Sequence, residues 1–330
     1  MSVSNPIKPL YKRLAAIGYT KKYVLGKVLP DWWEDCIAEN PAGYQQAAML
    51  LSRNLRLDLR TLLDENATIH QRTLETPKYK LRGQDTEDTV RVATCIAYRA
   101  AQLACHALPT PYAELPPTAM AIRNAILATG ASCIGFEALL DYCWLNGIPV
   151  LHISEFPKDA HKPHALAAIV DGRPAIVLCK HTDYSAWLLF HLAHELGHIA
   201  LGHLQGKTIL VDVEIKGDTD TEEKEANQFA VELLTGFKQR SYSFGSVNAE
   251  QLATVATAFG HDTDVDGGFI ALSHGRVNNR WGLANGALKI IEPSPNAVAL
   301  VRERIKRNLD PELLSRDSAD YLMRITGAAE

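Results

Sequence analysis

The segment 194–198 reads HELGH and places two histidines four residues apart, with a glutamate next to the first. On an α-helix, residues four apart lie on the same face, so both imidazoles could bind one metal ion. The glutamate beside them could act as the general base of a zinc hydrolase. Apolar residues recur at three- and four-residue steps around the motif, which predicts a helix with one buried face. These residues are Leu188, Leu192, Leu196 and Ile199.

Catalytic zinc usually has three protein ligands and one open position, so a third ligand is expected elsewhere in the chain. Residues 219–234 predict a second helix, because Thr219 and Glu222 have the spacing of a capping box and acidic residues fill the first turn. Glu225 lies at the edge of the apolar stripe of this helix, beside small alanines that allow close packing. The rival ligands are Glu222, Glu223 and Glu232, of which Glu232 is the strongest.

The HELGH motif and the segment 225–234, EANQFAVELL, which begins 225 − 198 = 27 residues after the second histidine, together resemble the ImmA/IrrE family of zinc metallopeptidases. The segment 136–152, a predicted helix followed by a turn and a strand, is similar to the start of the catalytic domain of that family. Two motifs at the family spacing are far more specific than one.

The resemblance implies a zinc-dependent metalloendopeptidase that binds one Zn²⁺ ion. It implies His194, His198 and Glu225 as ligands and Glu195 as general base. It also implies a protein substrate, either a transcriptional repressor or an antitoxin, and a role in stress or mobile-element regulation. The alternative is a DNA-binding regulator or antitoxin whose metallopeptidase-like domain senses or docks without cleaving. The presence of all four site residues favours the enzyme.

A further hydrogen-bond donor is expected to stabilise the oxyanion of the reaction. The sequence does not choose among four candidates, which are Tyr184, His181, Tyr242 and His274. His191 precedes the motif by three residues, and we expect it to lie beside the ligands rather than to bind metal. His203 is five residues after His198, so we expect it to lie off the ligand face.

Residues 165–180 predict a β-hairpin, because two apolar runs flank Asp171-Gly172. A strand at the edge of a sheet can accept an extended peptide through backbone hydrogen bonds, so the hairpin favours a peptide substrate. The alternative is a purely structural hairpin that covers the active helix.

The composition is that of a globular protein, with 330 residues, of which 47% are hydrophobic and 22% charged. We find neither an apolar run of 18 residues nor an N-terminal signal pattern, which predicts a cytoplasmic protein with no membrane partner. Six cysteines without a CxxC pair indicate reduced core thiols. The segment 261–266 lacks the glycine and glutamate that complete an EF-hand loop, and we interpret it as a turn.

The first 75 residues predict short helices broken by Gly18, Pro30 and Pro41. Many members of the resembled family carry an N-terminal helix-turn-helix, and the segments 29–33 and 50–55 resemble a diverged one. Residues 1–62 hold nine Lys/Arg and five Asp/Glu, which gives 9 − 5 = +4. A DNA-binding face would need denser clustering, so DNA remains open as a partner beside a protein-docking role.

Together these patterns predict a mostly helical α+β fold, in which a small sheet carries the helix of the HELGH motif. We expect a helical module at 1–75, for which the family resemblance implies a helix-turn-helix-like fold. We expect a linker with a connecting helix at 76–114. The metallopeptidase domain is expected at 115–245, and a mainly helical extension at 246–330.

Overall fold

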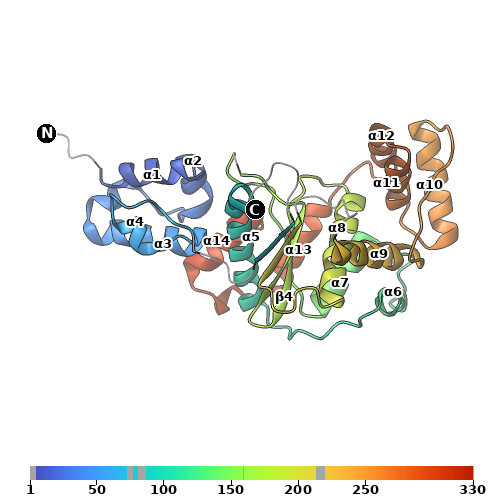
Figure 1. The fold of residues 1–330 in the computed structure, drawn as a ribbon, viewed down its shortest axis with the longest axis horizontal. Coiled ribbons are helices and arrows are strands. Elements are labelled where there is room, and N and C mark those ends of the chain that lie inside the picture. Colours follow the sequence, from blue (N-terminus) through green and yellow to red (C-terminus); the bar gives the residue numbers. More distant parts are fainter. Residues whose placement is uncertain (1–4, 73–76, 81–86, 159, 213–219, 330) are drawn as a thin grey trace.

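The computed structural model describes residues 5–72, 77–80, 87–158, 160–212 and 220–329. A helical module lies at one end of the molecule, a sheet with helices around it lies in the middle, and three helices lie at the other end (Figure 1). This arrangement confirms the predicted α+β fold with mostly helical content.

The strand order of the sheet is β1-β5-β3-β4-β2. The strands are β1 (Pro77–Lys80), β2 (Val150–His152), β3 (Ala165–Val170), β4 (Arg173–Leu178) and β5 (Ile209–Asp212). β3 is antiparallel to both of its neighbours, whereas the pairs β1 with β5 and β2 with β4 are parallel.

The predicted hairpin is confirmed as β3 and β4. Its turn residues Asp171 and Gly172 have φ angles of 50° and 83°, the left-handed conformation that a two-residue hairpin turn requires. However, β3 pairs with β4 and β5, and β4 pairs with β3 and β2. Both hairpin strands are therefore internal, and neither offers the free edge that would accept an extended peptide.

The predicted linker is wrong over Pro77–Lys80, which form the edge strand β1 parallel to β5. A proline at the first position of an edge strand is compatible with pairing, because it need not donate a ladder hydrogen bond. The rest of the expected linker, 76 and 81–85, lies outside the described residues.

The N-terminal module is helical, as predicted. Its elements are α1 (Ile7–Ala16), α2 (Lys21–Tyr23), the π-helical η1 (Val24–Val28), the 3₁₀ helix η2 (Asp35–Glu39), α3 (Pro41–Leu55) and α4 (Leu59–Leu63). Gly18 has a φ of 97° just after α1, which explains the break there. Pro41 begins α3, and the Asn40 side chain accepts a hydrogen bond from the Ala42 backbone N–H at 2.9 Å.

The middle of the molecule contains α5 (Glu87–Ala107), α6 (Ala119–Leu127), α7 (Phe136–Leu145), α8 (Ser185–Ala200) and α9 (Thr221–Thr235). α5 and α8 both pack against β3 and β4, from opposite sides of the sheet (Figure 1). α9 packs along α8 and also contacts α6.

The helices after residue 245 form two groups that pack in different parts of the molecule. α10 (Ala249–Thr263), α11 (Gly267–Val277) and α12 (Trp281–Ile291) pack on one another, and α11 also packs on α8. α13 (Ala297–Asn308) lies against β2 and α7, and after η3 (Pro311–Leu313) the chain ends in α14 (Arg316–Thr326), which packs on α5 and η1. The predicted turn at 261–266 is wrong over 261–263, which end α10, and only 264–266 connect α10 to α11. The domain boundaries stay predictions.

α14 connects the N-terminal module to the rest of the chain. The Tyr321 hydroxyl donates a hydrogen bond to the Asn54 carbonyl at 3.1 Å. Arg324 donates to the carbonyl of Leu29, at the end of η1, and forms an ion pair with Asp31 at 3.4 Å. The last helix and the N-terminal module are therefore packed together.

Within the described residues, no helix combines the length and apolar character that crossing a bilayer requires. All six cysteines are free thiols. Cys36 is exposed and Cys133 is half-buried, whereas the other four are buried in the core as predicted.

Arg123 joins three helices through backbone carbonyls. Its guanidinium donates to the carbonyls of Leu233 at 3.1 Å, Leu234 at 3.0 Å and Asp264 at 2.9 Å, and the residue is only 6% exposed.

We predict that Arg123→Met lowers the free energy of unfolding by about 2–3 kcal/mol, because three carbonyls lose a charged donor. Urea denaturation followed by circular dichroism measures the loss. Arg276→Met, at an exposed position of α11, is the control and should change stability by about 0.5 kcal/mol or less. Equal losses in the two variants would contradict this account.

Candidate metal centre

The HELGH motif lies on α8, as the sequence predicts. The apolar residues Leu188, Leu192 and Leu196 are fully buried and belong to the main hydrophobic core. His194, Glu195 and His198 are also 0% exposed. Fixed packing on one side of the helix therefore holds the polar residues of the motif in the interior.

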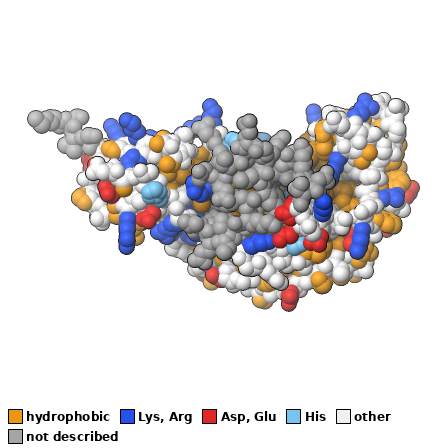
Figure 2. Space-filling model, viewed as in Figure 1, with side chains coloured by type: hydrophobic (Ala, Val, Ile, Leu, Met, Phe, Trp, Pro, Cys, Tyr) orange, Lys and Arg blue, Asp and Glu red, His pale blue; other side chains and the backbone are white. Residues whose placement is uncertain are grey.

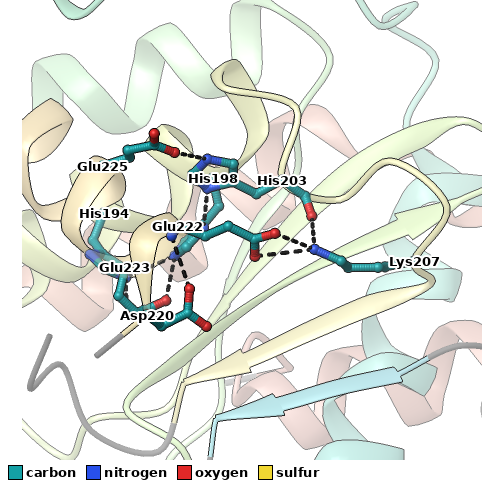
Figure 3. Close-up of polar contacts among 8 residues, drawn as sticks. All are labelled: His194, His198, His203, Lys207, Asp220, Glu222, Glu223 and Glu225. Atoms are coloured by element: carbon teal, nitrogen blue, oxygen red, sulfur yellow. Dashed lines mark hydrogen bonds and ion pairs between the residues drawn. The ribbon is translucent and has the colours of Figure 1, made fainter. Parts of the chain in front are cut away.

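Three side chains from α8 and α9 converge into what we call the His-His-Glu triangle, made of His194, His198 and Glu223. The two Nε2 atoms lie 3.1 Å apart, and Glu223 places Oε1 3.1 Å from His198 Nε2 and Oε2 3.3 Å from His194 Nε2 (Figure 3). Glu223 is 5% exposed. Among the described residues, this is the group of histidine and acidic side chains that is arranged to hold a metal ion.

The dimensions of the triangle suit zinc. Zinc binds histidine nitrogen and carboxylate oxygen at about 2.0–2.2 Å, so neighbouring ligand atoms of a tetrahedral site lie about 3.3 Å apart. The observed separations are 3.1, 3.1 and 3.3 Å. Three donors would occupy three of the four positions of such a site.

The charges also suit a divalent cation. Glu195 and Glu223 are carboxyl groups at 0% and 5% exposure, next to two buried imidazoles. Burying a carboxylate is costly unless an opposite charge or strong hydrogen bonds compensate it. A doubly charged cation bound by the triangle would balance both carboxylates.

Glu225, the predicted third ligand, does not take part in the triangle. Its side chain is 52% exposed, and its Oε2 lies 3.0 Å from His203 Nε2 (Figure 3). The sequence had left Glu223 open as a rival, and the structure brings this residue to the histidines instead. The stronger rival Glu232 belongs to the fourth turn of α9, and Glu222 pairs with Lys207 at 2.8 Å.

The helical period explains the choice between the two glutamates. With about 100° per residue, the stripe of Ala226, Phe229, Ala230 and Leu233 alone lies about 70° from Glu223 and about 90° from Glu225, which does not separate them. Leu234 is also buried, and including it puts Glu223 about 50° and Glu225 about 110° from the centre of the stripe. This additional leucine is the signal in the sequence that could have identified Glu223.

The N-terminal cap of α9 fixes which residues lie in its first turn. The Asp220 side chain accepts a hydrogen bond from the Glu222 backbone N–H at 2.9 Å and caps the helix. The predicted cap, Thr219, lies outside the described residues. Because the helix begins at Thr221, Glu223 lies in its first turn.

Glu195 of α8 lies near Cys179, the residue that follows β4. Burial raises the pKa of the Cys179 thiol, and the nearby Glu195 carboxylate adds to this rise. Glu195 follows His194 directly and precedes His198 by three residues, which places it about 100° from His194 and about 60° from His198 around the helix axis. It is therefore placed beside the triangle rather than in it, as a general base requires.

His191 lies beside the ligands, as expected. Its ring contacts the ring of His164, with 5.1 Å between the centroids. Burial lowers the pKa of His191 well below its ordinary value. The imidazole is therefore neutral near pH 7.

The contacts of the four candidate oxyanion donors do not identify one of them as the donor. Tyr184 precedes His194 by ten residues, about 15 Å along α8. His274 Nδ1 accepts a hydrogen bond from the Phe244 backbone N–H at 3.2 Å, and Tyr242 packs on an aromatic ring of α10. His181 is exposed. None of the contacts described for these residues involves the His-His-Glu triangle, so this role stays a prediction.

A cavity of about 550 Å³ lies at the C-terminal end of α8, just beyond the HELGH motif. The residues around it belong to the end of α8, the loop that follows and the β3–β4 turn, and include Ile199, Leu204, Lys207, Gly172 and Pro174. Neither Glu195 nor any residue of the triangle lines this cavity. It is therefore separate from the candidate metal centre.

The sequence was compared with protein-family models, curated proteins and solved structures. Residues 152–261 match the family model of peptidase M78, described as the IrrE N-terminal-like domain. Searches among curated proteins and among solved structures gave no match. The matched segment contains all of α8 and α9, and so every residue of the triangle. This part of the chain is therefore similar to the IrrE N-terminal-like domain described by the peptidase M78 family model.

Proposed function

We propose that the chain is a zinc-dependent metalloendopeptidase that hydrolyses peptide bonds of a protein target. The family match supports a metallopeptidase-like domain. The observation that carries the proposal further is the buried His-His-Glu triangle with Glu195 beside it. In this proposal, His194, His198 and Glu223 hold one Zn²⁺ ion. When bound, zinc supplies a Lewis acid that polarises a carbonyl and lowers the pKa of water.

The chemistry assigned to the protein itself rests on Glu195. As general base, its carboxylate takes a proton from the attacking water, and the same carboxyl group then gives this proton to the leaving amine nitrogen. Its burial holds the carboxylate in one place. The imidazoles of the triangle carry no proton-transfer role in this scheme, since both are used as ligands.

The target that we propose is a transcriptional repressor or an antitoxin, and the compartment is the cytoplasm. This part of the proposal rests on the resemblance of the two sequence motifs to the ImmA/IrrE family. The alternative is a DNA-binding regulator whose metallopeptidase-like domain docks or senses without cleaving.

The surface of the N-terminal module supports protein docking more than DNA binding. Lys21 pairs with Asp35 at 2.6 Å, and Lys27 pairs with Glu155 at 2.8 Å, which offsets part of the positive charge. On the face shown in Figure 2, the Lys and Arg side chains of the module lie at separated points rather than in one patch. DNA binding depends on several phosphate contacts from clustered cations.

The role of Glu195 is tested with Glu195→Gln. The amide has nearly the same shape but cannot take a proton, so we predict that cleavage falls about 10²- to 10⁴-fold while bound zinc is unchanged. Mass spectrometry of a peptide library digested by the zinc-loaded protein measures cleavage, and metal analysis measures zinc. Unchanged cleavage in the variant would refute this mechanism. If zinc is retained and the regulatory output in cells survives the substitution, the non-cleaving alternative replaces it.

The ligand set is tested by zinc affinity. We predict that Glu223→Ala weakens zinc binding about a thousandfold or more, because one of three protein ligands is lost. Glu232→Ala, which removes an acid from the fourth turn of the same helix, should leave the affinity unchanged. Competition with a chromophoric chelator measures the dissociation constants. Zinc binding that is equally tight in Glu223→Ala and in the parent protein would show that Glu223 is not a ligand.

A further inference from the structure

The loop that follows α8 turns back onto the second histidine of the motif. The backbone N–H of His203 donates to the carbonyl of His198 at 3.0 Å. Their side chains also meet, with 2.8 Å between the two Nδ1 atoms. The His203 side chain is 8% exposed, so this contact is in the interior.

The other ring nitrogen of His203 contacts α9. Its Nε2 lies 3.0 Å from Oε2 of Glu225 (Figure 3). The residues form a continuous chain from the triangle to the surface, in the order His198, His203 and Glu225. We call this chain the His198–His203–Glu225 relay.

The positions of the protons in the relay follow from the chemistry at its two ends. If His198 binds a metal through Nε2, that atom carries a lone pair, and the ring proton is on Nδ1. His198 Nδ1–H then donates to Nδ1 of His203. A neutral His203 that accepts at Nδ1 carries its own proton on Nε2, and this N–H donates to the Glu225 carboxylate.

The carboxylate fixes this direction because an ionised Glu225 can only accept hydrogen bonds. The opposite direction would put the proton of His198 on Nε2, where it would point at His194 Nε2, 3.1 Å away, and would block metal binding. Metal-bound histidines usually donate their other ring N–H to a carboxylate, a carbonyl or water. Here a second imidazole lies between the histidine and the carboxylate.

We propose that His203 and Glu225 are positioning residues of the metal centre. They hold the His198 imidazole in the tautomer and orientation that present Nε2 to the ion, and neither residue contacts the ion itself. This inference rests on the proposed zinc binding. It also gives Glu225, which belongs to the motif shared with the resembled family, a role other than that of a ligand.

A neighbouring ion pair holds the loop from which His203 reaches the ligand. Lys207 Nζ donates to the His203 carbonyl at 2.6 Å and pairs with the Glu222 carboxylate at 2.8 and 3.1 Å. Three glutamates at the start of α9 thus have three functions. Glu222 anchors the loop, Glu223 faces the histidines, and Glu225 ends the relay.

The experiment is a double-mutant cycle on the zinc dissociation constant, measured with zinc alone by competition with a chelator. We expect Glu225→Gln and His203→Phe each to weaken zinc binding about 10- to 100-fold. The double variant should bind no more weakly than the weaker single variant, because both substitutions act through the same relay. Glutamine removes the negative charge at the end of the relay, and phenylalanine removes both ring nitrogens of His203. Glu232→Gln is the matched control on α9 and should bind zinc as the parent does. Glu225 is half-exposed, so its amide variant is compatible with the fold even if His203→Phe is not.

Each outcome has a distinct meaning. If the parent protein binds no zinc, the proposed function fails. If the parent binds one zinc ion and both single variants bind it equally tightly, the relay is wrong. If Glu225→Gln weakens binding as much in His203→Phe as in the parent, Glu225 acts on the ion independently of His203, and the relay is overturned as well.

Discussion

The close approach of α8 and α9 is the interaction on which the candidate site depends. Gly197 lies between the two ligand histidines in sequence, and a Cβ atom there would lie 3.1 Å from the Phe229 ring and 3.3 Å from the Ala226 carbonyl oxygen. A larger residue would push the helices apart and withdraw Glu223 from both imidazoles. The approach brings two buried carboxyl groups together, which is costly without a compensating charge. A metal ion held by both helices would therefore stabilise this helix pair, since an ion that binds only the folded state stabilises that state.

The rest of the fold holds this helix pair in place. The sheet supports α8 through β3 and β4, and α7 packs on the same helix. Arg304 of α13 joins α7 through ion pairs of 2.7 Å with Glu137 and Asp141. The chain then continues into α14, which packs on α5 and η1. The N-terminal module is thus connected to the region of the candidate site through the last helices.

Features that depend on local sequence were predictable, and those that depend on distant partners were not. The HELGH helix and the Asp171-Gly172 hairpin follow from spacing and turn chemistry alone. β1 was missed because its polar sequence shows no alternation and its partner β5 begins more than 120 residues later. The internal position of the hairpin likewise depends on β2 and β5, which pair from outside it. The sequence pointed to Glu225 rather than Glu223 because one leucine, Leu234, decides which face of α9 is buried.

The most direct test of the account is a crystal structure of the zinc-loaded protein. The account predicts one ion bound by Nε2 of His194, Nε2 of His198 and the carboxylate of Glu223, with Glu225 still hydrogen-bonded to His203. An ion bound elsewhere, or an ion coordinated by Glu225 in place of Glu223, would contradict it.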